Sequence, residues 1–338
     1  MKTKLRWGII GAGHIAGSFS KGMAESRTSE TVAVASRSLE RAQQFGATYG
    51  IERCYGDYNE LLADSAVDAV YIANLHPQHA EWAIKAAQAG KHILCEKPIT
   101  MNYAQAQAVV NAARDNDVFL MEAFMYRCHP QTDKLIEVIK SGFIGQVRLI
   151  RATFSFNVGD KPEARTWAHG LGGGGILDVG GYCASMARLV AGVAQGKAFA
   201  DPEEVTAVGV IGKTRVDDYT VAALKFPGDI LAELSCGVQL SQDNTVRIFG
   251  SAGDILIPMP WQPSRNNTGE KIIINRAGAE TQILEIPLVR HLYSYEIDVV
   301  AKNLPARQAP EMSWDDTLGN MKTLDRWRAA IGLVYDFE

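Results

Sequence analysis

The chain has 338 residues, of which 47% are hydrophobic and 21% are charged, and its net charge is −4. This length suits about two domains of an ordinary globular protein. Because lysine and arginine form no basic run, we expect neither nucleic acid nor a membrane as a partner. No apolar stretch approaches the roughly 20 residues that cross a bilayer. We also expect no signal peptide, because residues 1–4 lead directly into an apolar strand. The five scattered cysteines lack CxxC spacing, which predicts reduced thiols and a cytoplasmic location.

The first part of the chain alternates short apolar runs with helical patterns. We expect strands at residues 5–10, 31–35, 69–73, 93–95 and 118–122. Helices are expected after Gly13 and over residues 39–49, 59–63, 78–90 and 103–116. Near-continuous apolar strands separated by helices of this length are typical of a doubly wound parallel sheet. The sequence therefore predicts an α/β Rossmann domain over residues 1–124.

A glycine motif follows the first expected strand. Gly11-Ala12-Gly13-His14-Ile15-Ala16 is the G-x-G-x-x-A form of the dinucleotide fingerprint, in the strand–turn–helix context that the fingerprint requires. Gly11 permits the tight turn, Gly13 lets the backbone approach a pyrophosphate, and Ala16 lets the helix pack closely on the strand. The N–H groups of the first helical turn, at His14-Ile15, would bind the anion. The motif predicts dinucleotide binding.

The residues after the second expected strand predict the choice of cofactor. An NAD-binding protein usually carries Asp or Glu there, which binds the ribose 2′-hydroxyl. This chain has Ser36-Arg37-Ser38 instead. Arg37 would pair with a 2′-phosphate, so NADP is favoured over NAD, which is not excluded. The alternative is that Ser38 caps the next helix and Arg37 is a solvated charge.

Polar side chains also follow the strand expected at 69–73. Asn74, His76 and His79 lie in this loop, and two histidines three residues apart suggest a metal. Neither histidine has an evident carboxylate or third ligand nearby. We therefore expect no metal, and we interpret the loop as one that contacts the ribose or nicotinamide and starts a helix.

The next strand ends in Glu96-Lys97-Pro98. Burying a lysine is costly unless it has a partner or a task. Lys97 would lie at the carboxyl edge of the parallel sheet, where such folds bind their ligands. One interpretation places Lys97 at the floor of a cleft, with Glu96 beside it and the cofactor nearby. The other is an ordinary surface ion pair between Glu96 and Lys97.

From about residue 125 the pattern changes to a β-rich one. We expect helices at 129–142 and 313–335, and strands at 147–157, 204–212, 220–226, 230–238, 245–250, 271–275 and 281–286. Alternating polarity in several strands suits a large, open, mainly antiparallel sheet with helices on one face. Residues 125–338 are therefore expected to form an α+β domain for substrate binding and oligomerisation. The uncovered face would expose apolar area, which predicts a homodimer or homotetramer formed through it.

Four consecutive glycines, Gly172–Gly175, precede Asp178 and Tyr182. Glycine loses much backbone entropy on folding, so this run predicts a close approach or an unusual turn. Asp178 and Tyr182 are four residues apart, which places both on one face of a helix. Alternatively, Asp178 is an N-cap and Tyr182 is a core ring.

Taken together, these stretches resemble the glucose–fructose oxidoreductase/inositol dehydrogenase (Gfo/Idh/MocA) family. The matching motifs occur in order along essentially the whole chain: residues 11–16, 95–98, 121–124, 145–147 and 173–180. Within the family the chain is most similar to the dimeric dihydrodiol dehydrogenases and the NADP-linked aldose dehydrogenases, through residues 73–79 and Tyr182-Cys183. Many other members have histidine where this chain has Tyr182. Met125 stands where the dihydrodiol branch tends to have tryptophan, which argues against an aromatic diol.

The resemblance implies hydride transfer between nicotinamide C4 and a secondary alcohol or hemiacetal carbon of a sugar, polyol or diol. A base and a cation near the reacting oxygen both favour this transfer. By analogy, Tyr182 carries the proton, Lys97 stabilises the oxyanion and lowers the pKa of Tyr182, and Asp178 orients Lys97 or the substrate. The roles of Tyr182 and Lys97 could be exchanged. Further candidates for substrate or nicotinamide contacts are Met125, Arg127, Arg165 and Trp167.

Two other functions are compatible with this resemblance. One is a glycosidase-like member that retains NAD and oxidises a sugar only transiently, which the NADP signature at Arg37 argues against. The other is a sensor or regulator that binds dinucleotide without chemistry. The joint presence of Lys97, Asp178 and Tyr182 argues against that second function.

Overall fold

The computed structural model describes residues 4–159, 161, 163–264 and 268–336. The chain divides into two compact units. The first unit comprises Met1–Cys128 and Val289–Thr317, and the second comprises His129–Leu288 and Leu318–Glu338.

This division differs from the single boundary expected near residue 124, because a late segment of the chain packs with the first unit. Within that segment, helix α8 (Leu292–Asn303) lies against α1 (His14–Met23). The two helices approach so closely that a Cβ added at Gly22 would lie 2.5 Å from the Cβ of Tyr293. These residues are so far apart in sequence that no local pattern predicts the packing of α8 against the first unit.

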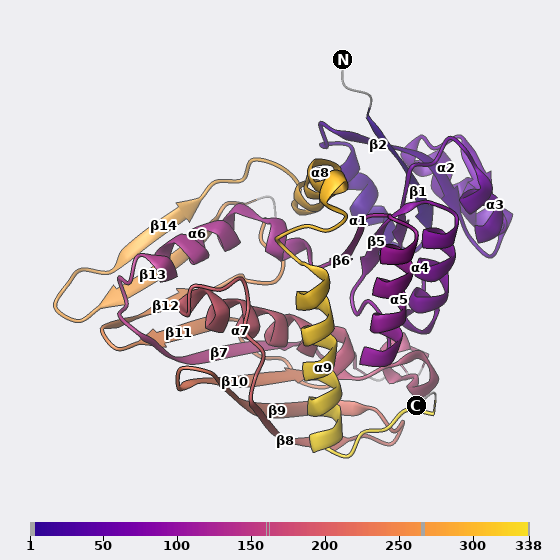
Figure 1. Cartoon of the computed structure of the whole chain (residues 1–338). Helices are drawn as coiled ribbons and strands as arrows, with labels where there is room; N and C mark the ends of the chain where they lie inside the picture. Colours follow the sequence, from indigo (N-terminus) through magenta and orange to yellow (C-terminus); the bar gives the residue numbers. More distant parts are fainter. Residues whose placement is uncertain (1–3, 160, 162, 265–267, 337–338) are drawn as a thin grey trace. The chain divides into compact units, whose positions relative to one another are not determined.

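The first unit contains a six-stranded, all-parallel sheet in the order β3-β2-β1-β4-β5-β6, with helices on both faces (Figure 1). This confirms the doubly wound fold. The strands are β1 (Leu5–Ile10), β2 (Ser29–Ala35), β3 (Arg53–Tyr55), β4 (Ala69–Ile72), β5 (His92–Glu96) and β6 (Leu120–Ala123). The other helices are α2 (Leu39–Tyr49), α3 (Tyr58–Ala63), α4 (His79–Gln88) and α5 (Tyr103–Asp115). The sequence pattern missed β3, which has only three residues.

Side-chain caps fix the starts of the helices that follow the strands. Ser38, Asp57 and Asn102 each accept a hydrogen bond from a backbone N–H in the first turn of α2, α3 and α5. Such caps satisfy donors that the helix itself leaves unpaired. The cap at Ser38, which the sequence offered as part of the alternative interpretation of residues 36–38, is therefore present, and it sets the position from which α2 begins beside the end of β2.

The second unit contains an eight-stranded sheet in the order β14-β13-β12-β11-β7-β10-β9-β8. Its neighbouring strands are antiparallel except for β7 and β10, which run parallel. The strands are β7 (Val147–Ser155), β8 (Glu204–Ile211), β9 (Asp217–Phe226), β10 (Ile230–Gly237), β11 (Val246–Gly250), β12 (Gly253–Ile257), β13 (Glu270–Arg276) and β14 (Gln282–Ile286). Of these, β12 was not expected.

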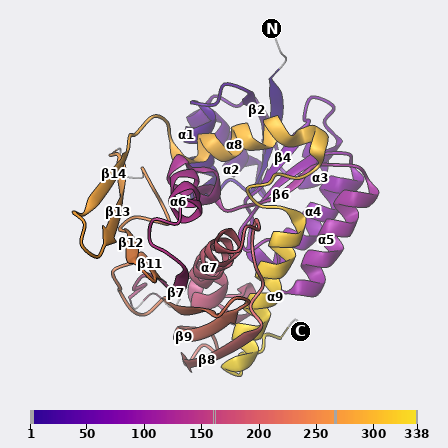
Figure 2. The same cartoon turned by 60° about the vertical axis from the view of Figure 1, so that its left-hand side comes forward.

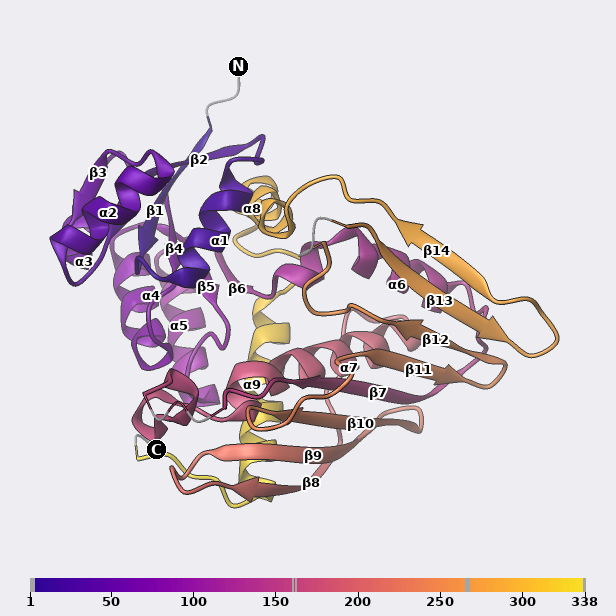
Figure 3. The same cartoon turned by 180° about the vertical axis from the view of Figure 1, so that it is seen from behind.

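Helices cover one face of this sheet. They are α6 (Pro130–Lys140), α7 (Gly181–Ala194) and α9 (Trp314–Ala330). Helix α7 lies along β7 (Figure 2) and also contacts β10. Figure 3 shows the opposite face, over which none of the described helices lies. The sheet is therefore open on one side, as expected from the alternation of its strands.

The segment His169–Ala194, which includes α7, differs from the expectation that no apolar stretch is long enough to cross a bilayer. By length and composition this 26-residue segment is apolar enough to cross a membrane, although the sequence was expected to hold no such stretch. The apolar window is completely buried inside the protein. A core helix surrounded by packed side chains has this composition, because it has no solvent-facing stripe.

Candidate active site

The glycine motif forms a sharp turn between β1 and α1. Gly11 has a φ of +102°, and a Cβ there would lie 2.8 Å from the carbonyl oxygen of Ala73. A Cβ at Gly13 would meet nothing within 4 Å, because this residue faces an open pocket. His14 and Ile15 form the first turn of α1, whose leading N–H groups have no partner within the helix. The turn thus offers backbone donors beside open space, which fits a bound pyrophosphate.

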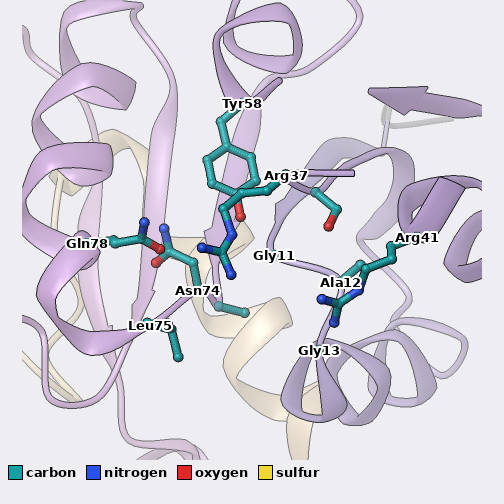
Figure 4. Close-up of a pocket in the computed structure, with 11 residues that line it drawn as sticks. Gly11, Ala12, Gly13, Arg37, Arg41, Tyr58, Asn74, Leu75 and Gln78 are labelled. Atoms are coloured by element: carbon teal, nitrogen blue, oxygen red, sulfur yellow. The ribbon is translucent and has the colours of Figure 1, made fainter. Parts of the chain in front are cut away.

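The same pocket extends to the end of β2 and the start of α2. It is lined by Gly11, Ala12, Gly13, Ser36, Arg37, Arg41, Tyr58, Ala73, Asn74, Leu75 and Gln78. In Figure 4 the guanidinium groups of Arg37 and Arg41 both turn into the space between Tyr58 and Gly13. No aspartate or glutamate is among these lining residues. Two cations without a carboxylate favour an additional phosphate over a bare ribose hydroxyl.

Sequence reasoning missed Arg41 and Tyr58 as parts of this pocket. A usable signal existed for Arg41, because it lies three residues after the capping Ser38 and donates its backbone N–H to that side chain at 3.3 Å. Because α2 starts directly after Arg37, a residue in its first turn, such as Arg41, lies at the same edge of the sheet as Arg37. No local signal marks Tyr58, which reaches the pocket only because α3 packs beside β2.

The histidine loop after β4 divides between pocket and core. Asn74 lines the pocket, whereas His76 is 6% exposed and His79 is completely buried. The Nδ1 atom of His79 lies 2.8 Å from the carbonyl oxygen of Pro98, and its Nε2 atom lies 3.2 Å from that of Asn74. His79 therefore ties the loop after β4 to the loop after β5. Among the described residues, no three histidine, cysteine, aspartate or glutamate side chains converge as a metal site would require.

Glu96 and Lys97 follow β5 directly. Glu96 is 7% exposed, and one of its carboxylate oxygens accepts a hydrogen bond from the hydroxyl of Tyr71. The other oxygen accepts the backbone N–H of Lys97 at 3.3 Å. Burial and the neighbouring Glu96 charge raise the pKa of the Tyr71 phenol well above its ordinary value. Glu96 is thus anchored inside the sheet, and the half-buried Lys97 stands at its carboxyl edge.

Asp178 and Tyr182 lie in the second unit, in a continuous helical stretch. Asp178 is in a π-helical turn, Ile176–Gly180, and Tyr182 is in the first turn of α7. The two side chains are 5% and 3% exposed. An Arg165 guanidinium nitrogen donates to Asp178 at 2.9 Å. Lys97 belongs to the first unit, so the structure describes each half of the candidate site by itself.

Asp217 explains one of the glycines that precede this turn, Gly174. Its carboxylate accepts the backbone N–H of Ile176 at 2.7 Å, so Asp217 provides the capping oxygen that the sequence alternative had assigned to Asp178. Gly174 has a φ of +99°, and a Cβ there would lie 2.1 Å from Asp217 Oδ1. Burial raises the pKa of Asp217 to about 7, against the hydrogen bonds from the backbone that lower it. Glycine at position 174 therefore allows a buried carboxylate to approach the backbone.

Tyr182 is part of an aromatic cluster. The ring centroids of Phe154 and Trp261 lie 5.2 and 6.0 Å from that of Tyr182, and the Phe154 and Trp261 rings stack on each other at 5.5 Å. The indole N–H of Trp261 donates to the carbonyl oxygen of Thr153 at 2.8 Å, which fixes the ring. Sequence reasoning missed both Phe154 and Trp261, because Phe154 lies in an ordinary strand and Trp261 is far from Tyr182 in sequence.

The remaining candidates occupy different environments. Arg127 is 4% exposed and pairs with Asp316 at 2.6 Å, so it is part of a buried ion pair in the first unit. Met125 is buried beside it in a short 3₁₀ helix. Arg165 and Trp167 lie in another short helix, and both are half-buried. Among these four, Arg165 contacts the predicted catalytic side chain of Asp178.

Known protein families match both the N-terminal and the C-terminal part of the chain. Residues 5–124 match the family described as the oxidoreductase family with an NAD-binding Rossmann fold, and residues 132–256 match the Gfo/Idh/MocA C-terminal domain. The chain is 38% identical over 262 residues to trans-1,2-dihydrobenzene-1,2-diol dehydrogenase of Mus musculus, which covers 77% of this chain and 76% of that protein. It is 34% identical over 343 residues to the protein of the same name from Danio rerio, with 98% of each chain covered.

Solved structures show the same architecture. A 3-ketoreductase from Actinomadura kijaniata in complex with NADP and TDP-benzene is 28% identical, with a TM-score of 0.87 over 97% of this chain and 98% of that one. An aldose–aldose oxidoreductase from Caulobacter crescentus complexed with glycerol is 25% identical, with a TM-score of 0.85 over 97% of each chain. The fold, the glycine turn and these similarities agree, and the chain belongs to the Gfo/Idh/MocA family of oxidoreductases with an NAD-binding Rossmann fold.

Proposed function

We propose that the protein is an NADP-dependent dehydrogenase or reductase that acts on a CH–OH carbon of a sugar, polyol or diol. The observation that carries this proposal is the pocket beside the glycine turn, in which Arg37 and Arg41 face open space and no lining residue is acidic. The 3-ketoreductase with the same architecture was solved with NADP. A 2′-phosphate would interact with both guanidinium groups, whereas the hydroxyl of NAD would lack these charge-assisted bonds.

The chemistry divides among three side chains. When bound, NADP(H) accepts or supplies hydride at its nicotinamide ring. The Tyr182 hydroxyl transfers the proton of the substrate hydroxyl, and the Lys97 ammonium stabilises negative charge on that oxygen. Asp178, held by Arg165, orients the neighbouring polar groups. In support, the ketoreductase has been crystallised as variants at one lysine and at one tyrosine.

Phe154 and Trp261 suit a substrate with an apolar face. These two rings, stacked on each other beside Tyr182, offer an aromatic surface on which the C–H faces of a sugar or a cyclic diol can pack. The curated relatives are named for a cyclic diol, and one solved neighbour for aldoses. This favours a cyclic sugar or diol over a short linear alcohol.

The open face of the eight-stranded sheet supports a homo-oligomer. Apolar side chains on β8, β9 and β10 are exposed, including Val208 (69%), Val221 (46%) and Leu231 (50%). A second copy placed on this face would remove that apolar area from water. A sedimentation experiment at micromolar protein should therefore give a dimer or tetramer, and Val221→Lys should shift it toward monomer. We also propose a cytoplasmic location, because the five cysteines are scattered along the chain without CxxC spacing.

The decisive experiment follows nicotinamide absorbance with a panel of sugars, polyols and cyclic diols. We expect turnover with at least one class, and a kcat/KM roughly tenfold or more higher with NADP⁺ than with NAD⁺. Hydrolysis of a glycoside without net change in absorbance would instead favour the glycosidase-like alternative. Tight NADPH binding without turnover of any panel member would favour a sensor.

A further inference from the structure

The end of the described chain reaches the glycine turn of the second unit. After α9, Gly332 takes a φ of +71°, and the backbone N–H of Leu333 donates to the carbonyl oxygen of Arg328 at 3.0 Å. This arrangement closes a helix C-terminus and redirects the chain. The following tail segment, residues 333–336, leads to the short helices at Arg165–Trp167 and His169–Leu171 (Figures 1 and 3).

Tyr335 joins the tail segment to the glycine turn directly. Its side chain is 1% exposed, and its hydroxyl donates a hydrogen bond to the carbonyl oxygen of Gly173. Arg328 lies over the Tyr335 ring, with its guanidinium carbon 5.3 Å from the ring centroid. The phenol is therefore fixed by packing on one side and by the turn on the other.

His169 also holds the tail segment. Its Nε2 atom lies 3.0 Å from the carbonyl oxygen of Val334, and its ring centroid lies 5.0 Å from that of Tyr335. Its Nδ1 atom is 3.2 Å from Asp336, which also pairs with Arg215 at 2.7 Å. Because His169 is only 9% exposed, these contacts enclose most of its ring.

The glycine turn in turn connects the two polar groups beside Tyr182. The Gly174 N–H donates to the carbonyl oxygen of Thr166 at 2.8 Å, and the Gly173 N–H donates to that of Ala168 at 3.1 Å. Arg165 precedes the turn in sequence and Asp178 follows it, and the two side chains are joined by a hydrogen bond. A displacement of Gly173 would therefore alter the segment that carries Arg165 and the one that leads to Asp178.

We propose that Tyr335 is a positioning residue, which holds the Gly172–Gly175 turn so that the Arg165–Asp178 pair and Tyr182 stay in register for reaction. The predicted effect on kinetics rests on the proposed function, whereas the predicted effect of Tyr335 on the glycine turn does not. Tyr335 acts through the carbonyl of Gly173. The tail segment thus completes the substrate half of the site, although it lies more than 150 residues after the turn in sequence.

The structural test compares Tyr335→Phe with Val334→Ala. The first variant removes only the hydroxyl donor, whereas the second keeps the Val334 carbonyl and trims a side chain that is 64% exposed. In Tyr335→Phe, we expect amide hydrogen exchange in the peptide that covers residues 166–176 to become roughly five- to tenfold faster. Val334→Ala should exchange like the wild type.

The kinetic test separates positioning from general destabilisation. In Tyr335→Phe, kcat should fall and the KM for the alcohol substrate should rise, each roughly threefold to fivefold. The Kd of NADPH should stay within about twofold of wild type, because the lining of the dinucleotide pocket belongs to the first unit. Exchange and kinetics that match Val334→Ala would overturn the proposal, as would an equal loss of NADPH binding.

A second variant covers the case in which Tyr335→Phe does not fold. His169→Phe removes the bond to Val334 and keeps an aromatic ring beside Tyr335, so the same faster exchange is expected. If the wild-type protein turns over no panel substrate, the proposed function fails, yet the exchange experiment still decides whether Tyr335 holds the turn. Unchanged exchange in both variants would exclude this role for the tail segment.

Discussion

The two halves of the candidate site are built in different ways. The dinucleotide pocket lies at the ends of β1, β2 and β4 and consists of backbone, together with side chains such as Arg37 and Arg41 that stay exposed. In the Tyr182 half, Asp178 and Tyr182 are almost completely buried, and their surroundings include residues that are distant in sequence, such as Asp217 and Trp261.

This contrast indicates how each half should respond to change. Exposed arginines interact with a ligand and contribute little to folding, because solvent screens them. Buried groups such as Asp217 contribute to both stability and position, since each has lost its hydration and depends on fixed partners. Variants in the pocket should therefore change affinity alone, whereas variants around Tyr182 should change catalysis and stability.

The largest effect should come from the proton carrier. Tyr182→Phe keeps the ring in its aromatic cluster and should lower kcat by about 10²- to 10³-fold, with the Kd of NADPH unchanged. The matched control is Tyr219→Phe, because Tyr219 is 42% exposed on the open sheet face. If Tyr182→Phe kept more than a tenth of the wild-type kcat, Lys97 would be favoured as the proton carrier. The pH–rate profile of Lys97→Met would then decide that assignment.

Cofactor discrimination should change next most strongly. Arg37→Ala and Arg41→Ala should each raise the KM for NADP⁺ about tenfold and leave the KM for NAD⁺ within twofold, because each removes a charge-assisted bond to the 2′-phosphate. Arg27→Ala, which removes an exposed arginine outside the pocket, is the control. Equal weakening of both cofactors would contradict the assignment of these arginines to the 2′-phosphate.

Asp217 should make the protein less stable as the pH rises. Its folded-state pKa of about 7 lies above the ordinary value of 3.8, so its protonated form is favoured in the folded protein. The associated stability is fully present below pH 3.8 and is lost as the pH rises through about 7. Between pH 5 and 8 this loss is on the order of 3 kcal/mol.

Asp217→Asn should therefore show a smaller decrease in unfolding free energy between pH 5 and 8 than the wild type, measured in urea. Asp229→Asn, at an exposed turn with a φ of +58°, controls for the loss of one carboxylate. If Asp217→Asn and Asp229→Asn have the same pH dependence as the wild type, Asp217 does not titrate in this range.

His129 should give a smaller effect of opposite sign. It caps α6, and burial lowers its pKa to about 4 from the ordinary 6.5. The folded state therefore binds this proton less readily than the unfolded state, and stability present above pH 6.5 is lost as the pH falls toward 4. The loss is at most about 3 kcal/mol.

The variant that tests this effect is His129→Asn, since asparagine is also a good helix cap. It should lose less stability than the wild type between pH 7 and 4.5, measured by urea unfolding. A variant that became more sensitive to acid than the wild type would contradict a neutral, buried His129.

The sequence was sufficient for features in which local pattern and fold coincide. The glycine turn, Arg37 and the cap at Ser38 depend on short-range geometry, because a turn, a helix start and a strand end lie within a few residues of one another. The parallel sheet was also predictable, since strands buried on both faces must be continuously apolar. Lys97 could also be recognised from the sequence, because the apolar run of β5 ends directly before it and so places it at the carboxyl edge of the sheet.

What only the tertiary structure decided involves partners that are distant in sequence. The caps and walls of the Tyr182 half come from Asp217, Phe154 and Trp261, and its glycine turn is held by Tyr335. The return of α8 to the first unit belongs to the same class. A side chain in a strand or at a chain end has the same local pattern whether it packs against a catalytic residue or against ordinary core. The pairing is fixed by close packing and by the need to satisfy buried polar groups, and both arise only when the chain is folded.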